Sequence, residues 1–269
     1  MTDKVNPTSL FSDYMKVVGT PNLRFEKTAE PKLQGKKLGV VNGSSWVSLW
    51  SDWFGHKHLP GVKIVNVGNE AVQLNFMTAH SKGEDVPPQI NIDCFCQYAE
   101  DLVKLYGVDA VLISCSTMNR AYPKVAKRVE SYGVPVIQID QEMMERAVDR
   151  GGKILVIATH GPTVGSTTAL LKETAASRGR EVDFCGKTIE DAFELLGEGK
   201  IDEHNAKIAQ AIREIQAEQE IRSVVLAQMS MAVFSFTYPE PEKVFGIPVF
   251  NSADTGFERA ARVLAEGCR

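Results

Sequence analysis

The sequence predicts an α/β protein made of two similar lobes from an internal duplication, each a mainly parallel sheet flanked by helices, after an N-terminal arm. The first supporting observation is that short runs rich in Val, Ile and Leu alternate with longer amphipathic segments from Lys36 onward, a pattern typical of parallel strands joined by crossover helices. The second is that the same succession of strands and loops occurs twice. The third is a composition of 43% hydrophobic and 24% charged residues, which is enough for a chain of 269 residues to bury a core.

Residues 1–35 contain three prolines and show no sustained period, so we interpret them as an arm rather than a domain. Four apolar side chains, Leu10, Phe11, Tyr14 and Phe25, are interleaved along this arm. They predict that the arm packs on another surface, such as a neighbouring subunit.

Eight strands and six helices are predicted after the arm. The strands of the first set are residues 37–41, 62–67, 109–114 and 135–139, and those of the second set are 153–158, 181–185, 223–228 and 247–250. The helices are residues 93–106, 122–131, 141–149, 166–177, 202–218 and 256–265. The last helix carries apolar residues at helical spacing, which indicates one buried face.

Two pairs of segments carry the evidence for duplication. The segment "GVDAVLISCST" (107–117) aligns with "EIRSVVLAQMS" (220–230), and "YGVPVIQID" (132–140) aligns with "FGIPVFNSA" (245–253). Cys115 then corresponds to Gln228 and Gly133 to Gly246, both at an offset of 113 residues. We expect a first lobe at 36–150, a second lobe at 151–253, and residues 254–269 packed back on the first lobe.

The predicted strands end in unusually polar turns. These turns are "NGSS" (42–45), "SCSTMN" (114–119), "ATHGPT" (158–163), "QMS" (228–230) and "NSAD" (251–254). Ligands of open parallel sheets bind outside the carboxyl ends of the strands, and the helix N-termini that follow favour an anion such as a carboxylate. The same field is expected to lower the pKa of the Cys115 thiol. The alternative is that Cys115 is a buried core thiol.

With these features the chain resembles the aspartate/glutamate racemase superfamily, which also includes hydantoin racemases, maleate isomerases and arylmalonate decarboxylases. The resemblance covers nearly the whole chain after Lys36 and rests on the doubled lobe, the Cys-Ser-Thr turn at 115–117 and the "ATHGPT" turn. It implies that a cysteine after the third strand has a symmetry mate in the second lobe. Each thiol would address one face of the substrate α-carbon, while hydroxyls, amides and backbone N–H groups hold the carboxylate.

By position, Cys115 matches the first catalytic cysteine, and Gln228 stands where the second would be. Glutamine does not exchange protons near neutral pH, so the symmetrical two-cysteine mechanism is not supported. Gln228 either binds the substrate or fills the cleft. His160 is the candidate acid or base for the opposite face, and the alternative is a histidine that only hydrogen-bonds within its turn. The resemblance implies a substrate-binding set of Asn42, Ser44, Ser116, Thr117, Thr159, Thr163, Gln228 and Ser230.

The predicted function is that of a cofactor-independent isomerase of the racemase superfamily. It would act at the carbon next to a carboxylate of a small amino acid or dicarboxylate, with Cys115 as the proton-transfer group or nucleophile. One alternative is a decarboxylase or lyase of a substituted malonate-like acid that uses a single cysteine. A second alternative is a non-catalytic protein that binds small carboxylates.

Charge and cysteine usage exclude several other classes. The net charge of −4 gives no basic surface, so nucleic acid and anionic membrane are not expected partners. No apolar run approaches the roughly 18–20 residues that cross a bilayer. No secretory h-region opens the sequence and the five cysteines lack regular spacing, which predicts a cytoplasmic protein with reduced thiols and no metal site. The resemblance to the racemase superfamily implies that no cofactor is needed. "GHKH" (55–58) is interpreted as a loop, and the protein is expected to form a homo-oligomer, a dimer or higher.

Overall fold

The computed structural model describes residues 5–19, 30–159 and 161–267. The chain divides into two compact units. The first unit holds the residues up to Ile113, together with Ala121–Ile137 and the segment from Phe257 onward. The second unit holds Ser114–Arg120 and Gln138–Gly256. Each is described by itself, and the lobe boundaries expected from the sequence stay a prediction.

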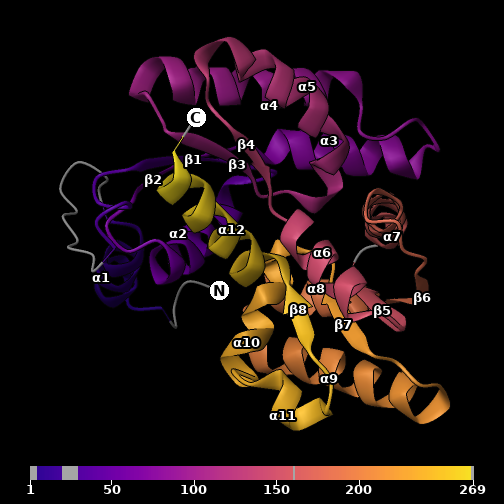
Figure 1. Cartoon of the computed structure of the whole chain (residues 1–269). Helices are drawn as coiled ribbons and strands as arrows, with labels where there is room; N and C mark the ends of the chain where they lie inside the picture. Colours follow the sequence, from indigo (N-terminus) through magenta and orange to yellow (C-terminus); the bar gives the residue numbers. More distant parts are fainter. Residues whose placement is uncertain (1–4, 20–29, 160, 268–269) are drawn as a thin grey trace. The chain divides into compact units, whose positions relative to one another are not determined.

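The first unit is built around a four-stranded sheet with the order β2-β1-β3-β4. Strand β1 pairs in parallel with both β2 and β3. The helices α4 and α5 cover one face of this sheet, and α2 lies with the C-terminal part of α12 on the other (Figure 1). The strands are β1 (Lys37–Asn42), β2 (Lys63–Gly68), β3 (Ala110–Ile113) and β4 (Val136–Gln138). The helices are α1 (Pro7–Val18), α2 (Ser48–His58), α3 (Glu70–Ser81), α4 (Gln89–Asp101), α5 (Tyr122–Val129) and α12 (Ser252–Glu266).

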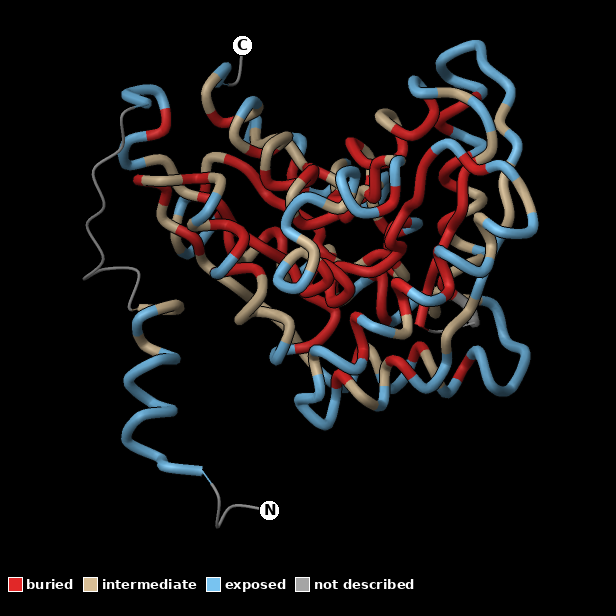
Figure 2. Tube along the Cα trace, turned by 90° about the horizontal axis from the view of Figure 1, so that it is seen from below, coloured by how far each residue is buried: buried red, intermediate tan, exposed pale blue. Residues whose placement is uncertain are grey.

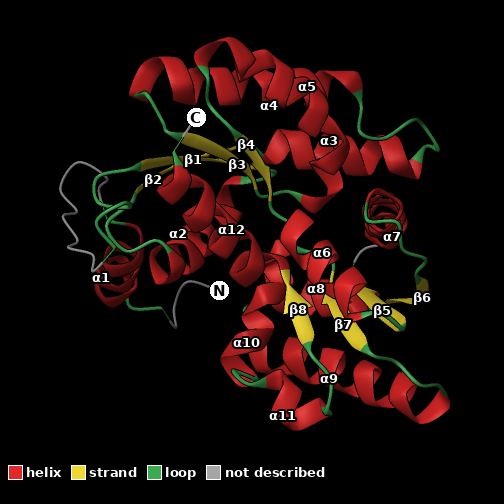
Figure 3. Cartoon of the chain, in the orientation of Figure 1, coloured by secondary structure: helices red, strands yellow, loops and turns green. Residues whose placement is uncertain are grey.

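The second unit repeats this plan with the strand order β6-β5-β7-β8, in which the neighbouring strands pair in parallel. Its helices lie on both faces of the sheet (Figure 3). The strands are β5 (Lys153–Ala158), β6 (Asp183–Thr188), β7 (Ser223–Leu226) and β8 (Val249–Asn251). The helices are α6 (Gln141–Arg150), α7 (Gly161–Ser177), α8 (Glu190–Gly197), α9 (Ile201–Glu218), α10 (Phe234–Thr237) and α11 (Pro241–Phe245).

Strand periodicity gives the second unit two separate apolar layers. Successive side chains of a strand point to opposite faces, so Leu155 and Ile157 of β5 pack with α9, while Ile154 and Val156 pack with α6 and α7. The central strands are therefore buried on both sides, as a parallel sheet covered by helices requires. This explains why β5 and β7 appear in the sequence as continuous apolar runs.

The structure confirms the fold class and the internal repetition. Both sheets have the same strand order. Cys115 and Gln228 each lie two residues beyond the third strand of their sheet, and each directly precedes a 3₁₀ helix, η4 (Ser116–Ala121) or η6 (Met229–Val233). Gly133 and Gly246 both have left-handed backbone, with φ of 67° and 72°, in the turn before the fourth strand. That conformation is costly for residues with a Cβ, which accounts for the glycine at both positions.

All eight predicted strands are present, but the sequence interpretation missed several helices. The segment "GHKH" is the end of α2 and not a loop, so that expectation was wrong. Helix α2 buries Ser51 and Asp52 beside Phe54, and these buried polar residues hide its amphipathic period. Within the predicted arm, α1 begins after Asn6, whose side chain accepts the N–H groups of Thr8 and Ser9.

Helix α1 has no buried residue and is exposed along most of its length (Figure 2). Leu10 and Phe11 are 59% and 66% exposed. The expected packing of the arm on another surface stays a prediction. In the described ranges, no helix is both long and apolar enough to cross a membrane, and no group of three or more His, Cys, Asp or Glu side chains is arranged to hold a metal ion.

Candidate active site

The turn that follows β3 presents a thiol and a hydroxyl together. The Cys115 Sγ lies 3.1 Å from the Thr117 Oγ1, and the Met118 N–H donates to the Cys115 carbonyl at 3.0 Å. Cys115 and Thr117 are half-buried, whereas Ser114, Ser116, Met118 and Asn119 are buried. Cys115 and Thr117 are therefore less buried than the residues on either side of them.

The buried carboxylate of Asp140 accepts hydrogen bonds from two buried residues of this turn. The Ser116 Oγ donates to Oδ1 of Asp140 at 3.1 Å, and the Asn119 Nδ2 donates to Oδ2 at 2.6 Å. Nearby, the Gln138 Nε2 donates to the Asn119 carbonyl at 3.1 Å. Sequence reasoning missed Asp140. The available signal was a charged residue directly after the apolar strand "PVIQI", at the carboxyl edge where the other polar turns lie.

Burial governs the ionisation of both groups. The pKa of Asp140 is raised to about 6 because burial disfavours its charged form, while hydrogen bonds from Asn119 and Ser116 act in the opposite direction. Burial also raises the pKa of the Cys115 thiol, against the lowering effect of hydrogen bonds from the Thr117 side chain and the backbone of Met118 and Thr117. The Asp140 charge raises the pKa of Cys115 further.

The expectation that Cys115 has a lowered pKa was therefore wrong. The helix after Cys115 is the short 3₁₀ helix η4, and the favourable field of such a turn does not offset the loss of water around the sulfur. At neutral pH the resting group is the protonated thiol. It is an acid ready to donate, and it needs a bound substrate or a hydrogen-bond donor to stabilise it as a base.

In the second unit, Gln228 is hydrogen-bonded to Thr159, and these residues follow the paired strands β7 and β5. The Gln228 Oε1 accepts from the Thr159 N–H at 2.6 Å and from the Thr159 Oγ1 at 2.9 Å, and both residues are buried. The amide oxygen thus joins the ends of β5 and β7. In the part of the chain that the structure describes, the Gln228 Nε2 has no hydrogen-bond partner, so the amide N–H₂ is the part of this side chain that can still donate to a ligand.

Two further predicted residues lie in the same unit. Thr163 is in the first turn of α7 and is fully buried, and its Oγ1 has no hydrogen-bond partner among the described residues. Ser230 is a buried residue of η6, and it follows Gln228 by two positions as Thr117 follows Cys115. His160 lies outside the described residues, so its role as second acid or base stays a prediction.

Asn42 and Ser44 belong to the first unit. Asn42 is fully buried at the end of β1, where its Oδ1 accepts from the Ser51 Oγ at 2.7 Å and its Nδ2 donates to the Asn66 Oδ1 at 3.0 Å. These bonds connect β1 with α2 and β2. Ser44 is also buried, and its carbonyl lies close to Gly68, where an added Cβ would meet it at 2.8 Å. Substrate binding by Asn42 and Ser44 stays a prediction.

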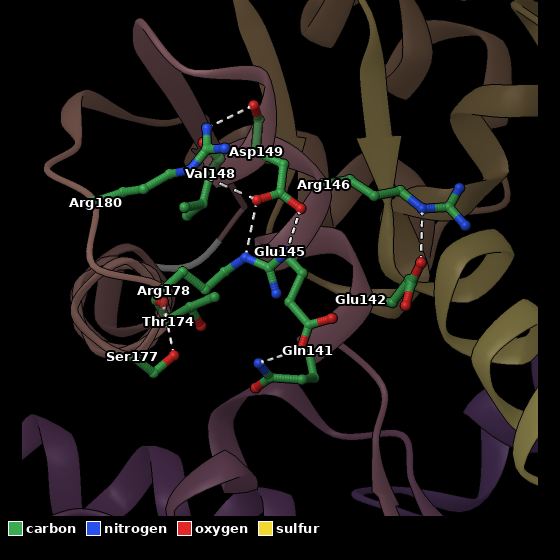
Figure 4. Close-up of polar contacts among 10 residues, drawn as sticks. All are labelled: Gln141, Glu142, Glu145, Arg146, Val148, Asp149, Thr174, Ser177, Arg178 and Arg180. Carbon is green, nitrogen blue, oxygen red and sulfur yellow. Dashed lines mark hydrogen bonds and ion pairs between the residues drawn. The ribbon is translucent and has the colours of Figure 1, made fainter.

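The helices that follow two of these turns are clamped together at their far ends. Helix α6 begins right after Asp140, and α7 begins two residues after Thr159. The Asp149 carboxylate at the end of α6 accepts from the Arg178 Nε at 2.9 Å, and the Arg180 Nη1 donates to the Asp149 carbonyl at 2.8 Å (Figure 4). On the same helix, the Glu142 carboxylate accepts from the Arg146 Nε at 2.9 Å.

In the second unit, the structure thus joins the predicted residues into two hydrogen-bonded groups. The first contains Cys115, Ser116 and Thr117 and is anchored on Asp140. The second contains Thr159 and Gln228. Both groups lie where strands of a parallel sheet end, which is where such folds bind small ligands.

Comparison with known families gives a match over residues 68–260 to the model of the Asp/Glu/Hydantoin racemase family. No curated protein matches the chain. The matched range includes the Cys115 turn, Asp140, Thr159 and Gln228, so both hydrogen-bonded groups lie inside it.

Solved structures with the same fold include several racemases. A putative Asp/Glu racemase from Yersinia pestis is 17% identical with a TM-score of 0.60, covering 85% of this chain and 99% of that one. A glutamate racemase from Thermus thermophilus, in complex with β-chloro-D-alanine, is 18% identical with a TM-score of 0.58, covering 87% and 82%. An allantoin racemase from Klebsiella pneumoniae is 14% identical with a TM-score of 0.58, covering 87% and 91%. At these identities the likeness concerns the fold.

Proposed function

Because the chain belongs to the Asp/Glu/hydantoin racemase family, we propose that it is a cofactor-independent isomerase. It acts at the carbon next to a carboxylate of a small amino acid or dicarboxylate. The observation that carries the proposal is the Cys115 turn, in which the thiol of a half-buried residue lies 3.1 Å from the Thr117 hydroxyl at the end of a strand.

In this proposal Cys115 moves the proton at the substrate α-carbon. Removal of that proton by the Cys115 thiolate leaves a planar, enolate-like intermediate. A proton returned by the thiol to the same face only exchanges the α-hydrogen, so isomerisation requires that the intermediate also receive a proton from the opposite face. The protonated resting state of Cys115 suits the donating half of the cycle. In the other half, the hydrogen bond with Thr117 and the backbone N–H groups of the turn stabilise the thiolate.

The substrate carboxylate requires donors that are not already engaged. The Thr163 Oγ1 and the Gln228 Nε2 meet this condition within the described residues, and Thr163 lies in the first turn of α7, where the helix field favours an anion. Thr117 adds a hydroxyl beside the thiol. Such donors also stabilise the negative charge that develops on the carboxylate in the transition state.

The amide at position 228 makes the proposed proton transfer one-sided. Racemisation requires one competent group on each face, so a racemase would need His160 or another residue opposite Cys115. A decarboxylase or lyase that protonates its intermediate from one face needs only Cys115. Gln228 at the second cysteine position is the observation that favours a decarboxylase or lyase as the second candidate function.

Solvent-isotope exchange tests the proposal. The protein is incubated in deuterated water with a panel of small amino acids, dicarboxylates and substituted malonates, and α-carbon deuterium and carbon dioxide release are measured. We expect exchange with at least one substrate in the parent, loss of that exchange in Cys115→Ser, and no loss in Cys185→Ser. Cys185 is the matched control because it is a half-buried cysteine on β6 of the same unit.

Three outcomes separate the candidates. Exchange accompanied by conversion to the other isomer, without carbon dioxide release, supports the isomerase, and carbon dioxide release from a malonate supports the lyase. Binding of these acids without exchange or decarboxylation would contradict both and leave a carboxylate-binding protein.

A further inference from the structure

We propose that Asp140 is a positioning residue of this site, which holds the Cys115 turn from its buried side and thereby sets the direction and reactivity of the thiol. The inference deepens the proposed function, on which its catalytic meaning rests. Its test uses the chemistry of the thiol itself and so does not require that function to be right.

The residues that bond to Asp140 lie next to the reactive residues of the turn in sequence. Its two carboxylate oxygens accept from Ser116 and Asn119, which are buried, while Cys115 and Thr117 are half-buried. Both residues on which the turn is anchored are therefore held by a single carboxylate. With Ser116 fixed on one side of it and Asn119 on the other, Thr117 keeps its hydroxyl against the sulfur.

Asp140 also occupies a position where an aspartate normally serves another purpose. It is the N-cap residue of α6, and aspartate is among the preferred residues there because its carboxylate accepts N–H groups of the first helical turn. Here the side chain makes no such capping bond. Both oxygens accept from the Cys115 turn, and the Ser252 hydroxyl at the start of α12 also lowers the pKa of this carboxylate. Helix capping therefore does not account for Asp140.

The burial of Asp140 is costly, which argues that the carboxylate has a role. The residue is 1% exposed, and among the described residues it forms no ion pair that would offset the loss of water. An apolar or amide side chain would be cheaper to bury there. The ionisable group that responds to its charge is Cys115, whose pKa the Asp140 carboxylate raises.

The support beneath Asp140 is itself rigid. The preceding Ile139 packs so closely on Gly256 that an added Cβ at Gly256 would lie 2.6 Å from the Ile139 carbonyl. Gln138, the last residue of β4, donates to the Asn119 carbonyl. The end of β4 and Asp140 thus anchor the turn at three places, through Ser116, the Asn119 side chain and the Asn119 backbone.

The test measures the alkylation rate of Cys115 by iodoacetamide against pH, with the modified peptide identified by mass spectrometry. The variants are Asp140→Asn and Asp140→Ala in the full chain. An amide can still accept from Asn119 and donate to Ser116, so Asp140→Asn keeps the turn but removes the charge. Asp140→Ala removes both hydrogen bonds. The matched control is Asp149→Asn, the same change at the opposite end of the same helix.

We expect Asp140→Asn to move the pH midpoint of Cys115 alkylation downward, because the like charge that opposes thiolate formation is gone. Asp140→Ala should in addition speed amide hydrogen exchange in residues 115–119, and Asp149→Asn should leave both measurements at the parent values. If Asp140→Ala does not fold, Asp140→Asn together with Ser116→Ala carries the test. A parent-like midpoint in Asp140→Asn, or unchanged exchange at 115–119 when the anchor is cut, would overturn the inference.

The substrate assay separates the two proposals. Where a substrate is found, a positioning role predicts that Asp140→Ala, which removes both hydrogen bonds to the turn, lowers kcat more than it raises KM, whereas Asp140→Asn, which keeps the turn, loses less. If no substrate shows isotope exchange while the alkylation midpoint still moves, the proposed function fails and the role of Asp140 stands.

Discussion

The Cys115 turn and the Gln228 turn share one backbone plan and differ in what their side chains do. Each begins two residues after the third strand of its sheet, is followed by a 3₁₀ helix, and carries a hydroxyl two residues further on, at Thr117 or Ser230. The Cys115 side chain contacts the hydroxyl of its own turn, and the residue is half-buried. Gln228 is 9% exposed and bonds to Thr159 beside the neighbouring strand.

The difference shows that a repeated backbone fixes where a group is placed but not what chemistry it performs. A thiol can give and take a proton, whereas an amide only orients and binds. The repeated fold of this chain provides two equivalent positions, and one of them carries a structural cross-link between the ends of strands β5 and β7.

The largest effect is expected from removing the thiol. Cys115→Ala, or Cys115→Ser with its much less acidic hydroxyl, should lower the exchange rate by about 10²–10⁴-fold, the usual contribution of a positioned acid or base. Isotope exchange with the substrate identified in the panel measures this loss. If either variant retains most of the activity, Cys115 is not the group that transfers the proton.

The scaffold behind the Cys115 turn gives the second effect. Gly256→Ala places a Cβ 2.5 Å from the Ile139 Cγ1 and 2.6 Å from its carbonyl, so we expect a loss of about 1–3 kcal/mol in the free energy of unfolding. Urea denaturation measures it. The control is Gly165→Ala in α7, where nothing lies within 4 Å and alanine should be neutral or stabilise by up to about 1 kcal/mol. Equal effects at both sites would contradict the packing argument.

Asp140, which anchors the Cys115 turn and among the described residues forms no such bond to the Gln228 turn, should make the stability of the protein depend on pH. The folded-state pKa of about 6 lies above the ordinary aspartate value of 3.8, so the folded protein binds this proton more tightly than the unfolded chain does. This stabilisation is fully present below about pH 4 and is lost as pH rises through about 6.

Asp140→Asn removes that titration, so its stability relative to the parent should be better at pH 7 than at pH 4, by up to about 3 kcal/mol. Denaturation of both proteins at the two pH values provides the measurement. A stability difference between variant and parent that is independent of pH, or of opposite sign, would mean that burial does not raise the pKa of Asp140.

The cross-link of the Gln228 turn predicts a smaller and different effect. Gln228→Ala leaves the buried N–H and hydroxyl of Thr159 without their acceptor, which should cost about 1–3 kcal/mol of stability. In the isotope-exchange assay the same change should raise KM rather than lower kcat, because the amide orients but transfers no proton. A large fall in kcat at unchanged KM would show that the two turns are less different than the contacts indicate.

The smallest effect is expected at the surface clamp between α6 and α7. Asp149 and Arg178 are both substantially exposed, so Asp149→Asn should change the free energy of unfolding by no more than about 1 kcal/mol. Thermal unfolding at low and high salt checks this. A larger loss would assign the clamp a role in holding the turns at the other ends of these helices.

Much of this comparison follows from the sequence because apolar runs and their repeat are written there directly. The strands, the match between Cys115 and Gln228, and the polar strand ends come from patterns of period and spacing. Helix α2 was missed because it buries Ser51 and Asp52, and α1 was missed although Asn6 and Pro7 form a helix start.

The electrostatics were less accessible from sequence. Hydroxyl neighbours indicated a reactive thiol at Cys115, but its burial, which raises the pKa, depends on how the turn packs. Asp140 showed the same limitation, since its partners Ser116 and Asn119 are more than 20 residues away in sequence and come together only in the folded turn.

The central claim is that Cys115 supplies proton transfer from one face and that Gln228 supplies none. The direct measurement is α-carbon deuterium incorporation, followed for each enantiomer of the substrate separately, in the parent and in Gln228→Cys. The parent should exchange one enantiomer much faster than the other, and Gln228→Cys, which restores a thiol at the matching position, should raise exchange of the slower one. Comparable exchange of both enantiomers in the parent would contradict the claim and direct attention to His160 as the second base.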